Sequence, residues 1–539
     1  MLGRLLDRAI GAFSPERGLR RMQARASMEQ LEAYTGKAGY DAVIPSRLQR
    51  CLKGAEVTEN SLPWAQFDNL RRLSWQLWRT TPQARKAVNA LVSKVVGDGN
   101  QPQSLATKPN GKPDEKFRDR AEQLFRLLEE NCDIRGRPGY GGQSWAQLDR
   151  LAFKHVILSG EVLTRFVSAT AAEVRDRKLP IDTLLHVMPA SRLDTFHRPD
   201  AFSPMDEPTT FRGVEFDERG RRVAYHLLPT NWAGRYIGFG DYERVPVDEL
   251  IHTYLSEEID AVRGTPWLAA AVLKISGASD YEFAETKAAE MSACVVLGYS
   301  KSAGQTQFGL NAPVGASGRD EDSNRLERMQ PGMVLDLGTN GKIEGFNPQR
   351  PNSQAAPFVQ HLVRMIACAL PGVKGTSMTL DFAGSSYTSE RAADNEVWPE
   401  ILAVQDWWIK HRRKPMYDRI VRDAVIAGWF KGVVSDEDFA DREMEYLAAQ
   451  FSVPVQLALN PKDDTTAVPM RIKAGISSPQ IEALQAGHDM GELLDQMAQF
   501  REMVIERGLP ASYADQLLGI LPNVGGNQMD AAAAAAEAA

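Results

Sequence analysis

The chain lacks the short motifs that carry common enzyme chemistry. Its three Gly-Lys pairs begin at Gly36, Gly111 and Gly341, and none continues into Ser or Thr or has a glycine five positions earlier. A nucleotide-binding P-loop needs both features, so none is present. The zinc-protease pattern H-E-x-x-H and the hydrolase elbow G-x-S-x-G are also absent. We therefore predict no catalytic residues and no ATPase activity in this chain.

Histidine and cysteine are scarce and scattered. No two of the eight histidines lie within four residues of each other, which excludes a metal-binding pair on one turn of a helix. A metal site assembled in three dimensions stays open. The four cysteines, Cys51, Cys132, Cys294 and Cys368, form no C-x-x-C pair, a pattern typical of reduced thiols inside a cell. We expect neither a metal nor another cofactor.

Long apolar runs and an excess of basic charge are missing as well. No stretch approaches eighteen apolar residues, and the short basic segment 1–13 lacks the pattern of a signal peptide. We therefore expect no membrane contact and a location in the cytoplasm of the producing cell. The formal net charge is −7. A protein that grips DNA tightly is usually basic, so this balance argues against a clamp but allows a conduit in which DNA slides.

What is present indicates a mixed α+β, helix-rich protein of several domains. The 539 residues are 43% hydrophobic and 25% charged, which is ordinary for globular proteins. Helical spacing is followed by period-two segments and then by further helices. The expected helices are 64–96, 117–132, 145–159 with Ser144 as N-cap, 358–370, 388–429 with interruptions at Pro399 and Pro415, and three patterns in 468–519. The expected strands are 162–167, 183–188, 224–228 after a hairpin turn at 217–220, and 333–337 and 345–346 around a turn at 338–341.

The segment from Arg263 to Val296 is the most informative one. It opens Arg-Gly-Thr-Pro and continues for some thirty residues rich in Ala, Glu and Lys. Pro266 suits the first turn of a helix, and such a helix would span roughly 40 Å. One face carries mainly small apolar residues: Ala270, Leu273, Gly277, Tyr281, Ala284, Ala288, Met291 and Val295. The opposite face carries Ser279, Glu282, Thr286 and Glu290. Two interpretations follow: a long surface helix on a globular core, or a helix in a ring of subunits with its acidic face toward a lumen.

The words around that helix resemble the portal proteins of tailed bacteriophages, in the lambda-like family. They occur in the family's order from about Ser14 to about Leu509. The matching words are 14–21, 85–99, 159–163, 213–225, 245–252, the R-G-x-P-x-L opening at 263–268, and 386–392. Departures occur in the tryptophan-containing words near the N-terminus, at 460–464, and at 255–260, where this chain is acidic and the family often has a basic link.

The resemblance implies a subunit with wing, stem, clip and crown regions that assembles into a dodecameric ring. By its order the regions are a 1–60 N-terminal arm, a 61–265 wing, a 266–294 first stem helix, a 295–352 clip, a 353–371 second stem helix, a 372–387 tunnel loop, a 388–465 long helical segment of the wing, a 466–530 helical crown and a 531–539 low-complexity tail. The tunnel loop, with Gly residues that permit several backbone states, would face DNA.

The function that the resemblance implies is that of a non-enzymatic ring at one capsid vertex. Double-stranded DNA would pass through it in packaging and ejection, and the implied partners are the large terminase subunit, major capsid or scaffold proteins and a head-tail connector protein. We expect it in the virion, and in the host cytoplasm during assembly. The expected DNA-channel residues are Ser279, Glu282, Thr286, Glu290, Lys374, Thr376, Ser377 and Thr379. The expected subunit-interface residues are Ala270, Leu273, Gly277, Tyr281, Ala284, Ala288 and Met291. The alternatives are a helical scaffold or adaptor protein without a channel, and an unrecognised hydrolase.

Three further patterns allow two interpretations each. The basic run 410–414 fits either salt-bridge partners or a DNA contact. Trp398, Trp407, Trp408 and Trp429 fit either core and interface packing or a stacking platform for single strands. The acidic clusters 257–258, 436–438 and 463–464 fit either solvated loops or paired catalytic carboxylates. We favour the first interpretation in each case.

Overall fold

The computed structural model describes residues 64–194, 209–230, 242–293, 297–301, 334–339, 355–382, 384–456, 461–485 and 490–518. The predicted N-terminal arm, most of the predicted clip and the low-complexity tail lie outside these ranges. The chain forms two compact units. The main unit comprises Met1–Ser93 and Arg126–Trp429, and the second unit comprises Lys94–Phe125 and Phe430–Ala539.

The main unit is built on a helix that leads directly into a central strand. Helix α6 (Trp145–Ser159) begins at Ser144, whose hydroxyl accepts from Gln147 N while the Gln147 side chain accepts from Ser144 N. This reciprocal capping box confirms the predicted N-cap. The helix ends at Gly160, which has a φ of 86°. Strand β2 (Glu161–Ser168) follows and lies between β3 (Thr183–Pro189) and β8 (Leu250–Tyr254) in an antiparallel sheet.

A second antiparallel sheet of the main unit has the order β4-β5-β6-β7. Its strands are β4 (Thr209–Phe211), β5 (Val214–Phe216), β6 (Arg222–Leu227) and β7 (Glu243–Pro246). Between β5 and β6 the Asp217 carboxylate accepts from Arg219 N and Arg221 N, which confirms the predicted hairpin turn. Buried residues from both sheets form one core cluster that includes Leu163, Met188, Val214, Tyr225 and Leu250.

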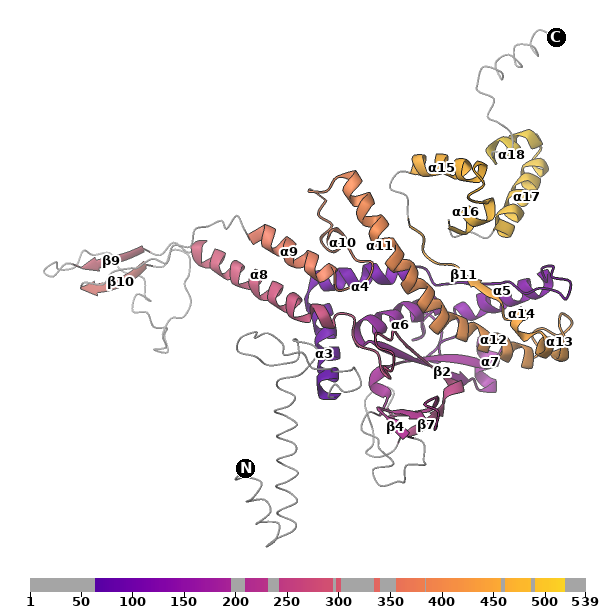
Figure 1. Cartoon of the computed structure of the whole chain (residues 1–539), viewed down its shortest axis with the longest axis horizontal. Helices are drawn as coiled ribbons and strands as arrows, with labels where there is room; N and C mark the ends of the chain where they lie inside the picture. The colour runs from indigo at the N-terminus through magenta and orange to yellow at the C-terminus, as the bar shows by residue number, and fades with distance from the viewer. Residues whose placement is uncertain are drawn as a thin grey trace, which may run out of the picture. The chain divides into compact units, whose positions relative to one another are not determined.

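The predicted helical stretch 64–96 is two helices, α3 (Trp64–Thr80) and α4 (Pro82–Val95). The break falls at Thr81, because a proline disfavours the helical conformation of the residue before it. Pro82 itself suits the first position of the new helix. Figure 1 shows α3, α4, α6 and the other elements along the chain.

The long helical segment after 386 is α11 (Tyr387–Trp408), a π-helical turn (Ile409–Arg413) and α12 (Lys414–Ile426). The predicted interruption at Pro399 is wrong, because Pro399 lies inside α11. Ile401 and Trp408 bury their side chains fully on the main unit, and this packing outweighs the hydrogen bond that the proline removes. The predicted interruption near Pro415 corresponds to the π-helical turn.

The basic run 410–414 forms salt bridges. Arg412 and Arg413 are buried and each lies 3.0 Å from a carboxylate oxygen of Asp149, while Lys410 and Lys414 pair with aspartates on their own helices. A DNA contact by the two buried arginines is therefore wrong. Trp408 packs edge-on against Phe153 with ring centroids 5.0 Å apart, which confirms core packing for that tryptophan.

The second unit joins segments from two parts of the chain. Strand β1 (Pro102–Ser104) pairs with β11 (Ala449–Phe451), and Phe117 of α5 (Glu115–Glu129) stacks on Phe430 at 4.4 Å. The acidic cluster 436–438 forms the first turn of α13 (Asp436–Asp441), where carboxylates favour a helix N-terminus. A short helix α14 (Glu443–Tyr446) follows. The predicted three C-terminal helices are four: α15 (Pro461–Lys473), α16 (Pro479–Gln485), α17 (Met490–Glu506) and α18 (Ala511–Leu517).

Residues 266–380 supply the remaining elements of the main unit, together with α7 (Ala171–Arg177). They are α8 (Val272–Ala293), β9 (Leu297–Lys301), β10 (Val334–Thr339), α9 (Ala355–Ala367) and α10 (Gly375–Thr379). The predicted strand at 333–337 is confirmed as β10, although it runs to Thr339, inside the predicted turn. Its parallel partner β9 was not predicted. Of the cysteines, Cys132 is buried, Cys368 is exposed and both are free, while Cys51 and Cys294 lie outside the described residues.

Candidate channel-forming site

The predicted long helix exists but starts later than expected. Helix α8 begins at Val272 after a 3-10 turn at Ala269–Ala271, so Pro266 precedes the helix and the prediction that it occupies the first turn is wrong. The reason is packing. Trp267 N donates to Ile157 O at 3.0 Å, and the Trp267 ring lies edge-on to Phe153. The segment before α8 is therefore held against α6. The 22 residues of α8 span about 33 Å.

One face at the start of α8 packs on its own chain, which the sequence pattern did not predict. Val272, Ile275 and Ala278 of α8 are buried, as is Ala271 just before the helix, and α8 contacts α3. Their spacing of three and four residues is the usual signal of a core-facing stripe. It was hidden because small residues occur on several faces of this helix. From Tyr281 to Glu290 no side chain of α8 is buried.

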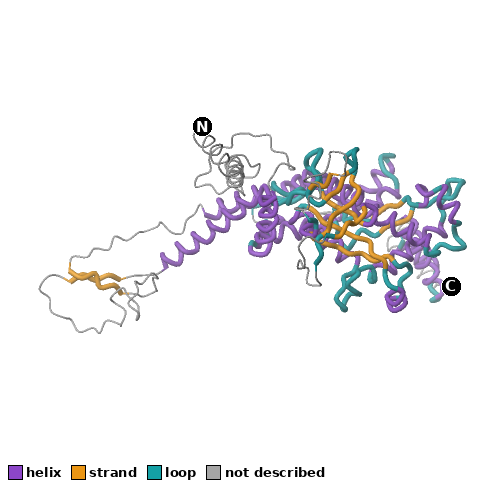
Figure 2. The backbone as a smooth tube through the Cα atoms, turned by 90° about the horizontal axis from the view of Figure 1, so that it is seen from below, coloured by secondary structure: helices purple, strands orange, loops and turns teal. Residues whose placement is uncertain are grey.

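The predicted subunit-interface residues lie mostly outside that core-facing stripe. Ala270, Leu273, Gly277 and Ala284 are exposed. Tyr281 is half-buried and lies edge-on to Phe358 of α9 with ring centroids 4.8 Å apart, and Ala288 is half-buried too. The side chain of Met291 is outside the described part of the chain. Figure 1 shows α8 and α9 beside each other, and Figure 2 shows the long α8 helix from below. Four of the seven predicted positions are exposed among the described residues.

The predicted channel residues on α8 lie on a second solvent-facing side. Glu282 is half-buried and accepts a long hydrogen bond of 3.4 Å from Gln83 of α4, and Ser279 is half-buried. Thr286 is exposed and donates to the Glu282 carbonyl oxygen at 2.8 Å. Glu290 is exposed and pairs with Lys287 at 2.6 Å. The charge of Glu290 is therefore partly offset on its own helix, which the sequence pattern did not reveal.

The segment predicted as a tunnel loop is partly helical and tied to α11. Residues Gly375–Thr379 form the short helix α10, which contacts α9 and buries Met378. Within it, Thr376 and Ser377 are half-buried and Thr379 is exposed. Gly372 N donates to the Glu400 carboxylate at 2.6 Å. The expectation of a loop throughout 372–386 is therefore wrong, because Met378 anchors one turn of helix on the core.

Lys374, one of the expected DNA-channel residues, is paired with two carboxylates of its own chain. Its ammonium group lies 2.8 Å from Glu390 and 2.8 Å from Asp394, both on α11. Burial acts to lower the pKa of Lys374, but the hydrogen bonds and charges of the two carboxylates raise it above its usual value. Thr376 Oγ1 also donates to Glu390 at 3.3 Å. Lys374 therefore fastens this segment to α11, and the triad carries more negative than positive charge.

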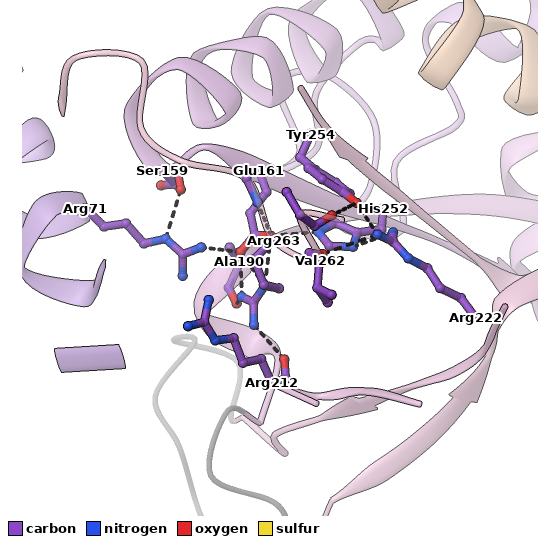
Figure 3. A network of polar contacts seen from close by, with 12 residues as sticks. Arg71, Ser159, Glu161, Ala190, Arg212, Arg222, His252, Tyr254, Val262 and Arg263 are labelled. Carbon is purple, nitrogen blue, oxygen red and sulfur yellow. Dashed lines mark hydrogen bonds and ion pairs between the residues drawn. The ribbon is translucent and has the colours of Figure 1, made fainter. Parts of the chain in front are cut away.

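A buried carboxylate, Glu161, anchors the base of α8. It lies at the start of β2 and is fully buried together with Arg263 (Figure 3). Arg263 Nε donates to both carboxylate oxygens at 2.8 and 2.9 Å, and Arg71 of α3 forms a second ion pair. Gly264 N donates to the same carboxylate at 3.3 Å. Arg263 also donates to backbone carbonyls, and its Nη1 donates to Arg212 O at 2.7 Å.

His252 of β8 completes this cluster as a neutral ring. Its Nε2 lies 2.7 Å from Glu161 Oε2, which places the proton on Nε2, and its Nδ1 accepts from Arg222 at 3.5 Å. Burial lowers the pKa of His252 to about 4 despite the adjacent carboxylate. Burial acts to raise the pKa of Glu161, but Arg263 and Arg71 hold it well below its usual range. The cluster is thus an ionised carboxylate with two arginines and one neutral imidazole.

Two glycines in the sequence motifs around this cluster have no room for a side chain. A Cβ on Gly160 would lie 2.1 Å from Gly264 O, and a Cβ on Gly264 would lie 2.2 Å from Gly160 O. The sequence motifs at 159–161 and 263–264 therefore lie with their backbones in close contact. His252, from the motif 245–252, joins them through the Glu161 carboxylate. Together they fix the position from which α8 starts.

The described residues contain no cluster of three or more His, Cys, Asp or Glu side chains arranged to hold a metal ion. None of the described helices combines the length and apolarity that crossing a membrane requires. Helix α8 is thus long and has few buried side chains, and the buried Glu161 cluster holds its start rigidly. Such an arrangement is suited to assembly.

We predict that Glu161→Gln lowers the free energy of unfolding by roughly 3–5 kcal/mol, because it leaves two buried arginines without their counter-charge. Urea denaturation at pH 7 measures this loss. The matched control is Glu243→Gln, which removes a partly exposed pair with Arg165 and should cost at most about 1 kcal/mol. Equal losses in the two variants would contradict the anchoring role.

We also predict a pH dependence that His252 carries. Because its folded pKa of about 4 lies below the ordinary value of 6.5, the unfolded chain binds the proton more tightly and stability falls as the pH drops below about 6.5. Between pH 7 and pH 5 this amounts to roughly 2 kcal/mol that His252→Gln removes. Comparing denaturation midpoints of parent and variant at both pH values tests it, and an unchanged pH slope in the variant would refute it.

The chain matches known proteins of one kind. A sequence model of the family described as phage portal protein, lambda family, matches residues 53–405. The probable portal protein of Halomonas phage phiHAP-1 is 26% identical over 323 residues, which cover 58% of this chain and 57% of that protein. The match therefore spans little more than half the length of this curated relative.

Solved structures give weaker similarities. A chain in the virion of a native gene transfer agent particle is 15% identical, with a TM-score of 0.38 over 81% of this chain and 96% of that one. A chain in the neck of the empty particle is 17% identical, with a TM-score of 0.38 over 77% of this chain and 94% of that one. TM-scores this low establish no shared fold. The sequence match covers more than half of the chain, including the anchor and helices α8 and α9, and by that match the chain belongs to the lambda family of phage portal proteins.

Proposed function

We propose that this chain is the subunit of a closed dodecameric ring at one vertex of a phage capsid, through which double-stranded DNA passes during packaging and ejection. Family membership supports this role, and the observation that carries it is the uncovered stripe on α8. Ala270, Leu273, Gly277 and Ala284 form a surface of small side chains that the chain itself leaves exposed. Neighbouring helices can approach such a surface closely, as ring assembly requires.

The regions of the ring follow the predicted order, with boundaries adjusted to the helices. Helix α8 is the first stem helix and α9 the second, and residues 372–387 form the tunnel segment. Residues 61–265 and 388–460 form the wing, 295–352 the clip, and α15 to α18 the crown. In this arrangement Ser279, Glu282, Thr286 and Glu290 face the channel with Lys374, Thr376, Ser377 and Thr379.

The acidic channel face suits a conduit. DNA affinity scales with the number of phosphates that basic groups neutralise, so a channel that must not hold DNA has few free cations. Each position repeats in every subunit, and Glu282 therefore becomes a circle of negative charge.

Since the sequence has no P-loop, packaging energy comes from a separate ATPase, the large terminase subunit, docked on the clip. Head-tail connector and capsid or scaffold proteins bind the other surfaces in the virion.

Native mass spectrometry of the purified chain tests the ring. We expect one closed assembly of about twelve subunits. A monomer would favour an adaptor protein without a channel, and turnover of a hydrolase substrate by that monomer would favour an enzyme. Either result contradicts the proposal.

We predict that Ala284→Trp prevents ring formation while the monomer stays folded, because an indole on the stripe blocks close approach of the next helix. The yield of rings should fall about tenfold or more, which corresponds to about 1.4 kcal/mol at the contact. Ala172→Trp on exposed α7 is the matched control and should assemble like the parent. Normal assembly of the Ala284 variant would show that this face is not an interface.

We predict that Glu282→Lys with Glu290→Lys makes the assembled ring bind DNA more tightly and with a steeper salt dependence. Each additional phosphate contact adds about 0.9 to the slope of log affinity against log salt. The control is Glu437→Lys with Asp441→Lys, which makes the same charge change on α13 of the second unit. If both double variants show the same slope as the parent, α8 does not present these residues to DNA.

We predict that Lys374→Met loosens the tunnel segment and reduces the DNA packaged per capsid while rings still form. The substitution leaves Glu390 and Asp394 facing each other without a cation. Hydrogen exchange of residues 372–382 should rise by about tenfold, since each ~1.4 kcal/mol of lost local stability is tenfold in exchange. Lys431→Met, on an exposed site, is the control. Unchanged exchange and normal filling in the Lys374 variant would refute the fastening role.

A further inference from the structure

A cavity of about 710 Å³ lies beside α3, away from the channel residues. Its basic wall consists of Arg71, Arg72 and Arg79, and its apolar wall includes Trp75 and Pro189. Arg71 is paired with Glu161, and Arg72 is paired with Asp68, which also lines the cavity. Arg79 instead lies over the Trp75 ring at 5.4 Å and has no carboxylate partner among the described residues. The cavity therefore combines this apolar wall, which forms its floor, with an excess of positive charge.

The positive charge continues along the same surface. Trp78 packs edge-on against Trp75 with ring centroids 5.8 Å apart, and both Arg85, at 5.2 Å, and Lys154, at 5.0 Å, lie over the Trp78 ring. Neither cation has a carboxylate partner in the part of the chain that the structure describes. Burial and the neighbouring Arg85 lower the pKa of Lys154. Like charges gathered in this way gain from an approaching anion, because each relieves the repulsion of the others.

The chain also exposes an acidic segment with matching features. Residues 256–260 follow β8 and read Ser-Glu-Glu-Ile-Asp. Ile259, between Glu258 and Asp260, is 101% exposed, and Glu257 is exposed beside Glu258. An exposed isoleucine between carboxylates complements a pocket with an apolar floor and a basic rim.

The cavity and the acidic segment flank the Glu161 cluster on opposite sides. Figure 3 shows Arg71, which lines the cavity, on one side of Glu161 and Tyr254 on the other; Tyr254 is the last residue of β8, and only Leu255 separates it from the acidic segment. Two complementary patches on different sides of one subunit produce a head-to-tail contact, and such contacts close into rings when the rotation permits.

We propose that the acidic segment 256–260 of one subunit docks into the basic cavity beside α3 of the next subunit, with Ile259 against the exposed Pro189 side of the apolar floor and Glu257 paired with Arg79. This contact rests on the proposed ring. It adds a polar contact outside the small-residue stripe of α8. This contact sets how neighbouring subunits align, since charge complementarity selects partner and orientation.

The geometry favours a protein segment over nucleic acid. Binding of single strands relies on bases that stack on open aromatic faces. Here cations already lie over the Trp75 and Trp78 rings. Phosphates alone would leave the apolar floor unused, whereas Ile259 fills it.

A charge exchange tests the contact in the full-length chain. Arg79→Glu and Glu257→Arg should each lower the ring yield about tenfold or more, because each places like charges at the contact. Combining them should restore the yield to within about threefold of the parent. Arg175→Glu and Glu437→Arg, at exposed sites on α7 and α13, are the controls and should assemble normally. Single variants that assemble like the parent, or a double variant that is not restored, would overturn the contact.

Disulfide trapping tests the same contact without charge effects. In a Cys368→Ser background, Ile259→Cys with Ser191→Cys, the latter on the cavity wall, should give covalent multimers on mild oxidation of assembled rings. Rings that form but yield no multimers would overturn the docking while leaving the ring intact. A parent that forms no ring would overturn both proposals. If Arg79→Glu assembles normally but binds DNA more weakly, the cavity is a nucleic-acid site and the docking proposal is wrong.

Discussion

The buried ion pair between Glu161 and Arg263 is the interaction on which the main unit depends. It joins the first residue of the central strand to the segment that starts α8, and Arg71 and His252 bring α3 and β8 to the same carboxylate. An ionised carboxylate without water is tolerated only because two arginines, an imidazole and a backbone amide surround it. A buried charge cluster of this kind favours one arrangement of its elements, since any shift leaves a charge unpaired. The start of α8 is therefore fixed relative to strands β2 and β8.

That rigidity has a consequence for assembly. The first turns of α8 are buried on α3, whereas no side chain from Tyr281 to Glu290 is buried. Beyond its first turns α8 is only partly covered by its own chain, through Phe358 of α9 and Gln83 of α4, which leaves side chains exposed for neighbouring subunits. In the proposed ring, a firm anchor lets identical helices present the same face at the same angle in every subunit. The second buried charge group, Asp149 with Arg412 and Arg413, holds α11 and α12 to α6 in a similar way.

Local features were predictable from the sequence, and long-range pairs were not. Ser144 capping, the hairpin at Asp217 and the existence of the long helix follow from spacing over a few residues. The partners of Glu161 lie 90 and 102 positions away, at Arg71 and Arg263, and no periodicity connects them. The same limit hid the pairing of Lys374 with α11, whereas the core-facing stripe of α8 was hidden because small residues occur on several faces of that helix. Family words marked Glu161 and Arg263 as notable, but only the fold shows that they touch.

In the proposed ring α8 lines the channel, and electron microscopy of the purified 539-residue chain tests this placement most directly. We expect rings with a central hole in which the small-residue stripe of α8 contacts the neighbouring subunit and Glu282 points toward the hole. Compact monomers, open fibres, or rings with α8 on the outer surface would contradict it.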